Sequence, residues 1–466
     1  MFKSSWDILA LGNLNHWSGC LSTVSYVSLG CPKALVDSEH IVTALADENF
    51  EVVGENSDAG VVVVNTCGFI NQAKAESYAA IEAAMENEQQ VVVTGCLGVE
   101  KEELLRRYPG LKFVSGPGDT VQVVKAVKSL NGESVDRLYD PALVGRDSGN
   151  RVLLTPEHYA YLKIAEGCNH KCTFCIIPTM RGPLTSKTLG ELVEEAQALV
   201  ENGVKELLLI AQDLSAYGLD RQYGAKRGSE SSYREDIFTL CNELAGIAPW
   251  LRLHYVYPYP HVDKLVEMMA EGRILPYLDM PLQHASPPIL KAMKRPASSE
   301  KTLERIQSWR SKIPDLSIRS NFIVGFPGET EQDLDLLLKF LDEAKLDRVG
   351  CFTYSEVEGA RANKLSGALS EREKLDRQDI VYEHQATISH KRLARHIGNT
   401  LEVIIDGEID DQVIGRTIFD APDIDGRVLI EGAQNVKPGD FISVEIKSCD
   451  DHDLNGDYLG HRIGLR

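Results

Sequence analysis

The first third of the chain alternates between short β-branched runs and longer helical patterns. Two stretches, 38–48 and 72–88, have the spacing of amphipathic helices. Three apolar runs bounded by glycine or asparagine have the composition of buried parallel strands: VSYVSL (24–29), VVVV (61–64) and VVVT (91–94). This strand–helix alternation predicts an α/β domain with a parallel sheet over residues 22–137.

The alternation restarts after a polar stretch that we interpret as a linker at 138–153. Helical patterns such as 189–203 and 331–345 separate the new apolar runs. The strand candidates are 159–164, 206–213, 252–258, 277–283, 317–325 and 348–355. Six β/α repeats predict a partial (β/α)6 barrel over 154–393, with a polar helix near 370–396 at its end.

Both ends of the chain have a different character. Short alternating runs such as LEVIID, RVLIEG and DFISVEIK, separated by Gly, Asp and Pro, predict a small antiparallel β-barrel over 395–466. Residues 1–21 carry no strand signal and no secretion signal, so we expect a disordered leader. No apolar run reaches 18 residues, which excludes a transmembrane helix and favours a cytoplasmic protein.

Composition is that of a globular protein with an acidic balance. The 466 residues include 49 Lys and Arg and 69 Asp and Glu, for a net charge of −20. A general nucleic-acid coat needs a basic surface, so the balance argues against that class. It leaves room for a local basic channel and suits a basic partner.

Candidate chemistry lies first in Cys168, Cys172 and Cys175, a C-x3-C-x2-C cluster after the first barrel strand. Three thiolates at this spacing can ligate three irons of a 4Fe–4S cluster and leave the fourth iron open. The alternatives are incidental thiols and structural zinc, which prefers four closed ligands in C-x2-C pairs. No second close pair occurs here, and the spacing therefore favours the cluster.

Three further cysteines, Cys31, Cys67 and Cys96, each follow a predicted strand of the first domain. Parallel strands end at one edge of the sheet, so these thiols can converge and hold a second cluster. The alternative is that they are small buried hydrophobes. The remaining cysteines lack partners at ligand spacing and are interpreted as structural thiols: Cys20, Cys241, Cys351 and Cys449.

The C-x3-C-x2-C cluster at the first barrel strand resembles the radical S-adenosylmethionine superfamily. The order of all three domains over 22–466 resembles its methylthiotransferase family, which ends in a TRAM barrel. The resemblance implies a transferase with two 4Fe–4S clusters, which replaces an unactivated C–H by C–SCH3. S-adenosylmethionine is then both methyl donor and radical source. Cys168, Cys172 and Cys175 would hold the radical cluster, and Cys31, Cys67 and Cys96 the auxiliary cluster.

Local strings resemble the RimO-type branch of that family. They are SLGCPKALVDSE (28–39), CNHKCTFCIIPTMRGP (168–183), LHYVYPYP (253–260), MPLQHAS (280–286) and FIVGFPGET (322–330). RimO-type enzymes modify the β carbon of an aspartate in small-subunit ribosomal protein twelve. One alternative is a tRNA adenosine methylthiotransferase of the MiaB type, although Pro32 and Lys33 replace its GCQMN-like string. The other is a non-catalytic iron–sulfur electron carrier or RNA-binding scaffold. Sulfur and electron donors have no signal in the sequence.

Six residues are candidates for contacting S-adenosylmethionine by their position at strand ends or beside the cysteines. Each has a plainer alternative as a barrel-rim, turn or packing residue. They are Phe174, Gln212, Asp213, Arg319, Gly325 and Glu329. We interpret His284 as a structural hydrogen-bonding residue.

The terminal barrel bears on the substrate. TRAM domains usually bind RNA, yet 396–466 holds 6 Lys and Arg against 15 Asp and Glu, a net charge of −9. Phosphate binding requires positive charge, so this module predicts a dock for a basic ribosomal protein rather than for tRNA. The alternative is a merely solvated acidic surface.

Overall fold

The computed structural model describes residues 22–54, 59–87, 89–133, 151–224, 235–295 and 299–461. The expected leader at 1–21, Cys20 and most of the expected linker at 138–153 lie outside these ranges. Two compact units divide the chain. The N-terminal unit is Met1–Thr155 with Ile176–Gly182, and the barrel unit is Pro156–Cys175 with Pro183–Arg466. Within the described ranges, none of the helices has the length and apolar character that crossing a membrane requires.

The N-terminal unit contains a parallel sheet in the order β2-β1-β3-β4-β5. Its strands are β1 (Thr23–Ser28), β2 (Glu51–Val53), β3 (Val61–Thr66), β4 (Gln90–Gly95) and β5 (Phe113–Val114). The strands predicted at 24–29, 61–64 and 91–94 are confirmed as β1, β3 and β4. The sequence did not predict β2 and β5, because strands of three and two residues are too short to show a pattern.

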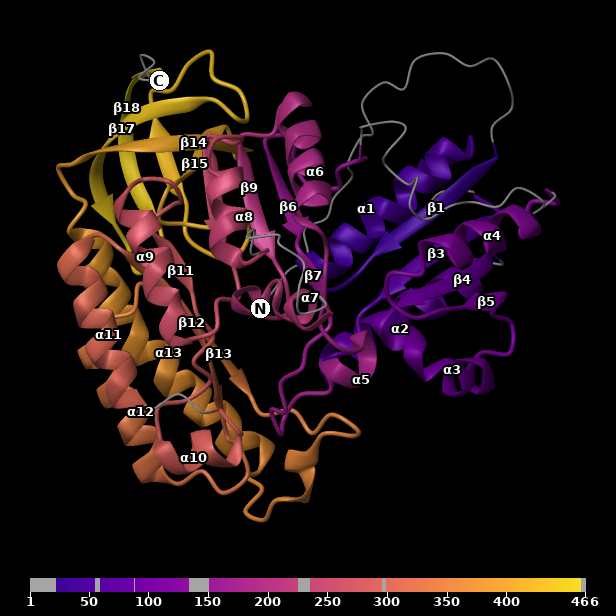
Figure 1. Ribbon diagram of the computed structural model, residues 1–466, viewed down its shortest axis with the longest axis horizontal. Coiled ribbons are helices and arrows are strands. Elements are labelled where there is room, and N and C mark those ends of the chain that lie inside the picture. The colour runs from indigo at the N-terminus through magenta and orange to yellow at the C-terminus, as the bar shows by residue number, and fades with distance from the viewer. Residues whose placement is uncertain are drawn as a thin grey trace. The chain divides into compact units, whose positions relative to one another are not determined.

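Helices cover both faces of this sheet (Figure 1). They are α1 (Pro32–Asp47), α2 (Asn71–Glu86), α3 (Lys101–Arg107) and α4 (Thr120–Leu130). Alternate residues of β3 face opposite sides, as the pleat requires. Val61 and Val63 pack in a core with α1 and α4, whereas Val62 and Val64 pack in a second core with α2 and α3.

Two later segments also belong to the N-terminal unit. The Val152 N–H donates to Thr43 Oγ1 at 2.9 Å, and the Leu154 N–H donates to Glu39 Oε1 at 2.9 Å. Residues 151–155, placed partly in a linker by the sequence, therefore pack on α1. The second segment is α5 (Ile177–Arg181), which follows Cys175 directly in the chain.

The barrel unit contains a six-stranded parallel sheet in the order β13-β12-β11-β10-β9-β6. Its strands are β6 (Tyr159–Lys163), β9 (Glu206–Ile210), β10 (Trp250–Leu253), β11 (Tyr277–Asp279), β12 (Ser317–Val324) and β13 (Arg348–Thr353). All six predicted barrel strands are confirmed. A short antiparallel pair, β7 (Ala165–Glu166) and β8 (Thr185–Ser186), flanks the cysteine loop.

Helices of the barrel unit lie along the outside of the curved sheet (Figure 1). They are α6 (Leu189–Glu201), α8 (Ile237–Leu244), α9 (Asp263–Ala270), α11 (Ser299–Lys312), α12 (Glu331–Ala344) and α13 (Glu371–Ala394). Two short helices, α7 (Leu219–Gly224) and α10 (Pro287–Ala292), lie in the segments that follow β9 and β11. The helices predicted at 189–203, 331–345 and 370–396 correspond to α6, α12 and α13. A capping box begins each of these three, which explains why their starts are sharp.

The C-terminal strands close into a five-stranded barrel in the order β14-β15-β16-β18-β17. They are β14 (Thr400–Ile409), β15 (Gln412–Thr417), β16 (Val428–Glu431), β17 (Phe441–Cys449) and β18 (Leu454–His461). The small barrel is as predicted, except that β16 and β18 pair in parallel while the other neighbours are antiparallel. The runs at 412–417 and 454–461 contain glycines, which hid these two strands from the sequence pattern.

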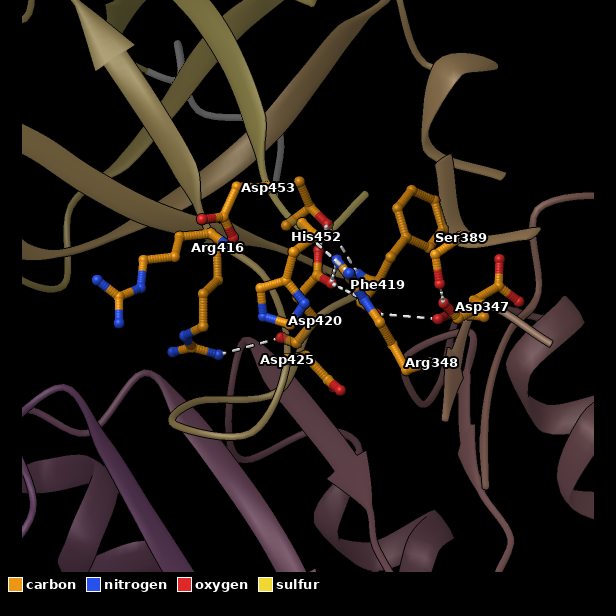
Figure 2. A network of polar contacts seen from close by, with 12 residues as sticks. Asp347, Arg348, Ser389, Arg416, Phe419, Asp420, Asp425, His452 and Asp453 are labelled. Atoms are coloured by element: carbon orange, nitrogen blue, oxygen red, sulfur yellow. Dashed lines mark hydrogen bonds and ion pairs between the residues drawn. The ribbon is translucent and has the colours of Figure 1, made fainter. Parts of the chain in front are cut away.

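The C-terminal barrel is joined to the larger barrel in a regular way. The first residue of each of the six parallel strands forms a hydrogen bond or ion pair with the C-terminal barrel. Glu206 of β9 accepts from Arg416 at 2.8 Å. Arg348 of β13 donates to Asp420 at 2.6 Å, as Figure 2 shows. The other four bonds are Tyr159 to Asp423, Trp250 to Glu402, Tyr277 to Asp425 and Ser317 to the Phe419 carbonyl. At the opposite, carboxyl edge of the sheet, β6 and then β7 lead into the loop that carries Cys168, Cys172 and Cys175.

Candidate active site

Cys31, Cys67 and Cys96, the first trio, lie at the carboxyl edge of three neighbouring strands. Cys31 caps the start of α1 after β1, Cys67 follows β3, and Cys96 follows β4. The thiols are close enough to interact electrostatically, since a Cys31 charge acts on Cys67 and both act on Cys96. A Cβ added to Gly30 would lie 3.6 Å from Cys67 Sγ. The structure therefore brings the three predicted thiols together.

Polar contacts at the ends of the strands fix this arrangement. The side chain of Asn65 in β3 donates from Nδ2 to the Ala34 carbonyl at 2.9 Å and to Ser38 Oγ at 2.7 Å. These bonds tie the start of α1, next to Cys31, to the end of β3. Gly95 has φ +93°, and any Cβ there would collide with the Thr66 carbonyl. Only glycine therefore lets β4 approach β3 so closely immediately before the last thiol.

Charged side chains give the thiols unequal acidities. The Arg181 Nε–H donates to Cys96 Sγ at 3.3 Å. Burial nevertheless raises the pKa of Cys96 to about 11, against the opposing influence of Arg181. Burial also raises the pKa of Cys31, but Lys33, Arg181 and backbone N–H groups outweigh it and hold the pKa below its ordinary value. Of these two thiols, Cys31 ionises at the lower pH.

Cys168, Cys172 and Cys175, the second trio, lie in the loop after β7. Thr173 anchors this loop through three bonds: its N–H donates to the Met293 carbonyl at 3.1 Å, its Oγ1 to the Ala292 carbonyl at 2.8 Å, and its carbonyl accepts from the Ala362 N–H at 2.9 Å. Burial, and then Asp213 and Cys172, raise the pKa of Cys168, although the His170 N–H lowers it. Cys168 and Cys172 are thus close enough to interact electrostatically.

Aromatic and charged groups surround the second trio. His170 lies between its cysteines in the chain, and its Nε2 is 2.7 Å from Asp213 Oδ2. Its ring stacks on Tyr257 at 4.4 Å with an interplanar angle of 11°. Arg295 covers the same Tyr257 ring at 4.0 Å and donates to Cys172 Sγ at 3.8 Å. The loop therefore rests on a packed layer of rings with a guanidinium beside one thiol.

Among the residues predicted to contact S-adenosylmethionine, Gln212 and Asp213 lie beside this loop. Gln212 donates to Glu166 Oε1 at 2.5 Å, two residues before Cys168, and Asp213 pairs with His170. Phe174 packs in an apolar cluster that includes Met293 and Phe326. Contacts of these three residues with S-adenosylmethionine stay predictions.

The other three candidates have protein partners. Glu329 is fully buried, receives a bond from Arg377 at 2.8 Å and lies 3.5 Å from His284 Nε2. Gly325 has φ +71°, and a Cβ there would meet the side chain of Lys374 of α13. Arg319 pairs with Asp279 at 3.0 Å and Asp425 at 3.4 Å, near the start of β12. Their contact with S-adenosylmethionine likewise stays a prediction.

His284 accepts a hydrogen bond from the Ser286 N–H at 2.9 Å, in agreement with its predicted structural role. Cys241 and Cys351 are buried, and Cys449 is partly exposed.

Sequence reasoning missed the two arginines that contact the thiols. Arg181 is 85 positions from Cys96, and Arg295 is 123 positions from Cys172. No local spacing connects residues so far apart. The only available signal for Arg181 was its place within the CNHKCTFCIIPTMRGP string.

Both trios fit an iron–sulfur cluster by the chemistry of their donors. All nine cysteines in the described ranges are free thiols. In the same ranges, no three His, Cys, Asp or Glu side chains surround one point as the ligands of a single ion would. A 4Fe–4S cluster differs in this respect, because its thiolates ligate separate irons. Each trio could therefore hold a cluster through three thiolates.

Three family descriptions match the chain in the order of its sheets. Residues 23–116 match "Uncharacterized protein family UPF0004", residues 162–341 match the "Radical SAM superfamily", and residues 397–459 match the "TRAM domain". The three matched segments correspond to the parallel sheet of the N-terminal unit, the larger barrel and the C-terminal barrel.

Full-length relatives decide the family. "Ribosomal protein uS12 methylthiotransferase RimO" of Stenotrophomonas maltophilia (strain R551-3) is 52% identical over 439 residues, covering 94% of this chain and 96% of the relative. The protein of the same name from Bordetella pertussis is 50% identical over 436 residues, covering 94% and 99%. The chain belongs to the RimO methylthiotransferase family. This RimO-family chain is thus matched over nearly the whole length of its relatives.

A solved structure supports the fold of the RimO-family chain. The radical S-adenosylmethionine methyltransferase TsrM from Kitasatospora setae superimposes with a TM-score of 0.51 at 17% identity, covering 71% of this chain and 73% of that one. At this identity the likeness concerns the fold alone.

Proposed function

We propose that this RimO-family protein is a methylthiotransferase that adds a methylthio group to the β carbon of an aspartate in ribosomal protein uS12. One observation carries the proposal. In this chain, which is 52% identical over 94% of its length to a uS12 methylthiotransferase, one cysteine trio follows three strands of a parallel sheet and the other lies in the loop after β7. The proposed location is the cytoplasm, where ribosomal proteins are modified.

The two trios receive different roles in this proposal. Cys168, Cys172 and Cys175 hold the radical 4Fe–4S cluster, and Cys31, Cys67 and Cys96 hold the auxiliary cluster. When bound, the clusters and S-adenosylmethionine supply a radical that removes hydrogen from an unactivated carbon, together with the methyl and sulfur that replace it. Gln212 and Asp213, which bond to Glu166 and His170 beside the radical trio, are candidates for orienting S-adenosylmethionine.

Protein residues shape the surroundings of the radical trio. The stacked rings of His170 and Tyr257 form a packed wall behind the cysteine loop. Asp213 orients the imidazole, and Thr173 fixes the loop backbone through its three bonds. These contacts hold the cysteine loop in one arrangement, which suits a site that must position a cofactor. Arg295 places a positive charge beside the Cys172 sulfur.

Charges on the C-terminal barrel favour a basic protein over tRNA as the substrate. Arg416 is buried and paired with Glu206 and Asp406, so it cannot reach a phosphate. Lys447 pairs with Glu445 and Asp457. Exposed acidic residues remain on the surface, among them Glu408, Asp410, Asp411, Glu431 and Asp451. Such a surface repels nucleic acid and complements a basic ribosomal protein.

Mass spectrometry of a strain that lacks this gene tests the function. We expect uS12 to lose its methylthio group, and the wild-type gene to restore it. A Cys168→Ala, Cys172→Ala, Cys175→Ala variant should fail to restore it. Loss of a methylthio group from tRNA with uS12 unchanged would instead establish the tRNA alternative.

A second assay addresses the non-catalytic alternative. Anaerobically reconstituted protein, given S-adenosylmethionine and a reductant, should form 5′-deoxyadenosine. Absence of this product from protein that has taken up iron and sulfide would favour an electron carrier or scaffold.

A further inference from the structure

The helix α5 brings a buried arginine to the first trio. Arg181 ends α5, and its side chain is only 2% exposed. The Nε–H donates to Cys96 Sγ at 3.3 Å, and the Nη1–H donates to Asp37 Oδ2 at 3.1 Å. Asp37, itself 4% exposed, lies in α1, the helix that Cys31 begins. The guanidinium is therefore held between the helix of one ligand and the sulfur of another.

We propose that Arg181 is a positioning residue for the first trio, and that its guanidinium, anchored by Asp37, raises the reduction potential of the iron–sulfur cluster held there. This inference rests on the proposed function, which assigns an auxiliary cluster to these cysteines. It adds Arg181 to that site and assigns to it an effect on the reduction potential of the cluster.

The physical reason is electrostatic. Reduction adds an electron to a cluster, so a nearby cation stabilises the reduced form more than the oxidised form. Hydrogen bonds to cluster sulfurs, net charge and burial are the means by which a protein sets such a potential. The Arg181 guanidinium provides all three, because it is charged, buried and bonded to Cys96 Sγ. Burial weakens the screening that solvent would give at an exposed site.

Arg181 reaches the first trio from a segment that is distant in sequence from the rest of the N-terminal unit. Arg181 follows Cys175, the last cysteine of the second trio, by six positions, yet α5 packs in the N-terminal unit. The segment that supplies Arg181 to the first trio therefore follows the second trio in the sequence. A role in positioning alone would need only the bulk of this side chain, whereas an electrostatic role needs its charge.

The test uses the full chain with Cys168→Ala, Cys172→Ala and Cys175→Ala, so that only the first trio can hold a cluster. Reconstituted protein should contain about four irons per chain. Its midpoint potential is then measured by reductive titration followed by electron paramagnetic resonance. Potential is a property of each loaded chain, so incomplete loading does not change it.

Three substitutions in this background separate charge from structure. Arg181→Gln should shift the midpoint potential to a more negative value, whereas Arg181→Lys should retain most of the parent potential. Asp37→Asn keeps an oxygen that can accept from Arg181 but removes a neighbouring negative charge, so it should shift the potential in the opposite direction. Arg106→Gln, at an exposed arginine of α3, should leave it unchanged.

Each outcome of these measurements either supports or overturns the proposed role of Arg181. An unchanged potential in Arg181→Gln with about four irons bound would overturn the role of Arg181 and leave the auxiliary cluster intact. A shift of the same sign in Asp37→Asn would overturn the electrostatic account. A parent protein that binds no iron would overturn both the inference and the auxiliary cluster on which it rests. If Arg181→Gln does not fold, Arg181→Lys and Asp37→Asn still carry the comparison.

Discussion

Arg416 Nη1 and Glu206 Oε2 lie 2.8 Å apart, although 210 positions separate the two residues in the sequence. Glu206 also accepts from Arg252 at 2.6 Å, and neither the Glu206 nor the Arg252 side chain is exposed to solvent. Glu206 is the first residue of β9, and the first residues of the other five barrel strands also bond to the C-terminal barrel. The two barrels of this unit are therefore joined at every strand.

Replacing Glu206 by Gln should destabilise the barrel unit. The substitution leaves two buried guanidinium groups without their shared carboxylate. Breaking a buried ion pair by removal of one partner costs about 3–5 kcal/mol. Chemical denaturation should detect this loss in the free energy of unfolding, while Glu201→Gln, at an exposed position of α6, serves as the control. Equal stability of the two variants would show that the ion pairs contribute nothing net.

Stability should decrease in acid because buried carboxylates have lowered pKa values. Burial raises the pKa of Glu206, but Arg416 and Arg252 outweigh it. The pKa of Asp279 is likewise lowered against burial, first by Arg319 and then by His254. A lowered folded-state pKa means that the unfolded chain binds protons first, at about pH 4. The resulting stabilisation is complete above about pH 5 and is lost as the pH falls below it.

Urea denaturation between neutral pH and pH 3.5 measures this effect. Glu206→Gln should show a weaker pH dependence than the parent, because one of the contributing groups is gone. A free energy of unfolding that stays constant or rises as the pH falls to 4 would contradict the prediction.

Removing the first trio should separate two activities. Protein with Cys31→Ala, Cys67→Ala and Cys96→Ala should still cleave S-adenosylmethionine to 5′-deoxyadenosine but should transfer no methylthio group to uS12. Cys449→Ala, at a partly exposed thiol far along the chain, should retain both activities. Chromatography of the nucleoside and mass spectrometry of uS12 read the two steps. Parallel loss of both steps would refute the division of labour between the trios.

Asp213→Asn should slow the cleavage of S-adenosylmethionine at the second trio without unfolding the barrel. Asn keeps an oxygen for the Ser215 N–H, which now donates to Asp213 Oδ1 at 2.9 Å, but it loses the charged bond to His170. A hydrogen bond to a charged group contributes about 1.5–3 kcal/mol. We expect the rate of 5′-deoxyadenosine formation to fall roughly tenfold or more, the factor that 1.4 kcal/mol represents.

Asp236→Asn is the matched control, because Asn caps a helix about as well as Asp and α8 should be unaffected. A parent rate in Asp213→Asn would indicate that the imidazole orientation does not matter for cleavage.

Gly325→Ala should destabilise the barrel unit by about 1–3 kcal/mol, because the residue has a positive φ. The new Cβ would also displace the stem of Lys374, which is buried in α13. Thermal unfolding measures the effect. Gly190→Ala, where a Cβ meets nothing within 4 Å and φ is not positive, should be neutral or slightly stabilising. A parent unfolding temperature in Gly325→Ala would show that α13 moves aside at no cost.

Much of this protein could be predicted from local pattern. The β-branched runs gave β1, β3 and β4, since a strand buried on both faces must be apolar throughout. Parallel strands end at a common edge, so the positions of Cys31, Cys67 and Cys96 after those strands predicted their convergence. Cys168, Cys172 and Cys175 were identified from their short spacing, because thiols so close in the chain can ligate one cluster. The sequence pattern did not predict β15 and β18, because glycines interrupt the alternation of apolar and polar residues in these strands.

Tertiary structure alone decided which distant side chains meet. Arg181 contacts Cys96, and Arg319 pairs with Asp279 and Asp425. Such contacts depend on how helices and barrels pack, which no periodicity records. The sequence by itself determined the strands with a continuous apolar or alternating pattern, the order of the domains and the six thiols, because these follow from local chemistry and spacing. Packing decided the charges around those thiols and the bonds between the barrels, since electrostatic partners are chosen by distance in space.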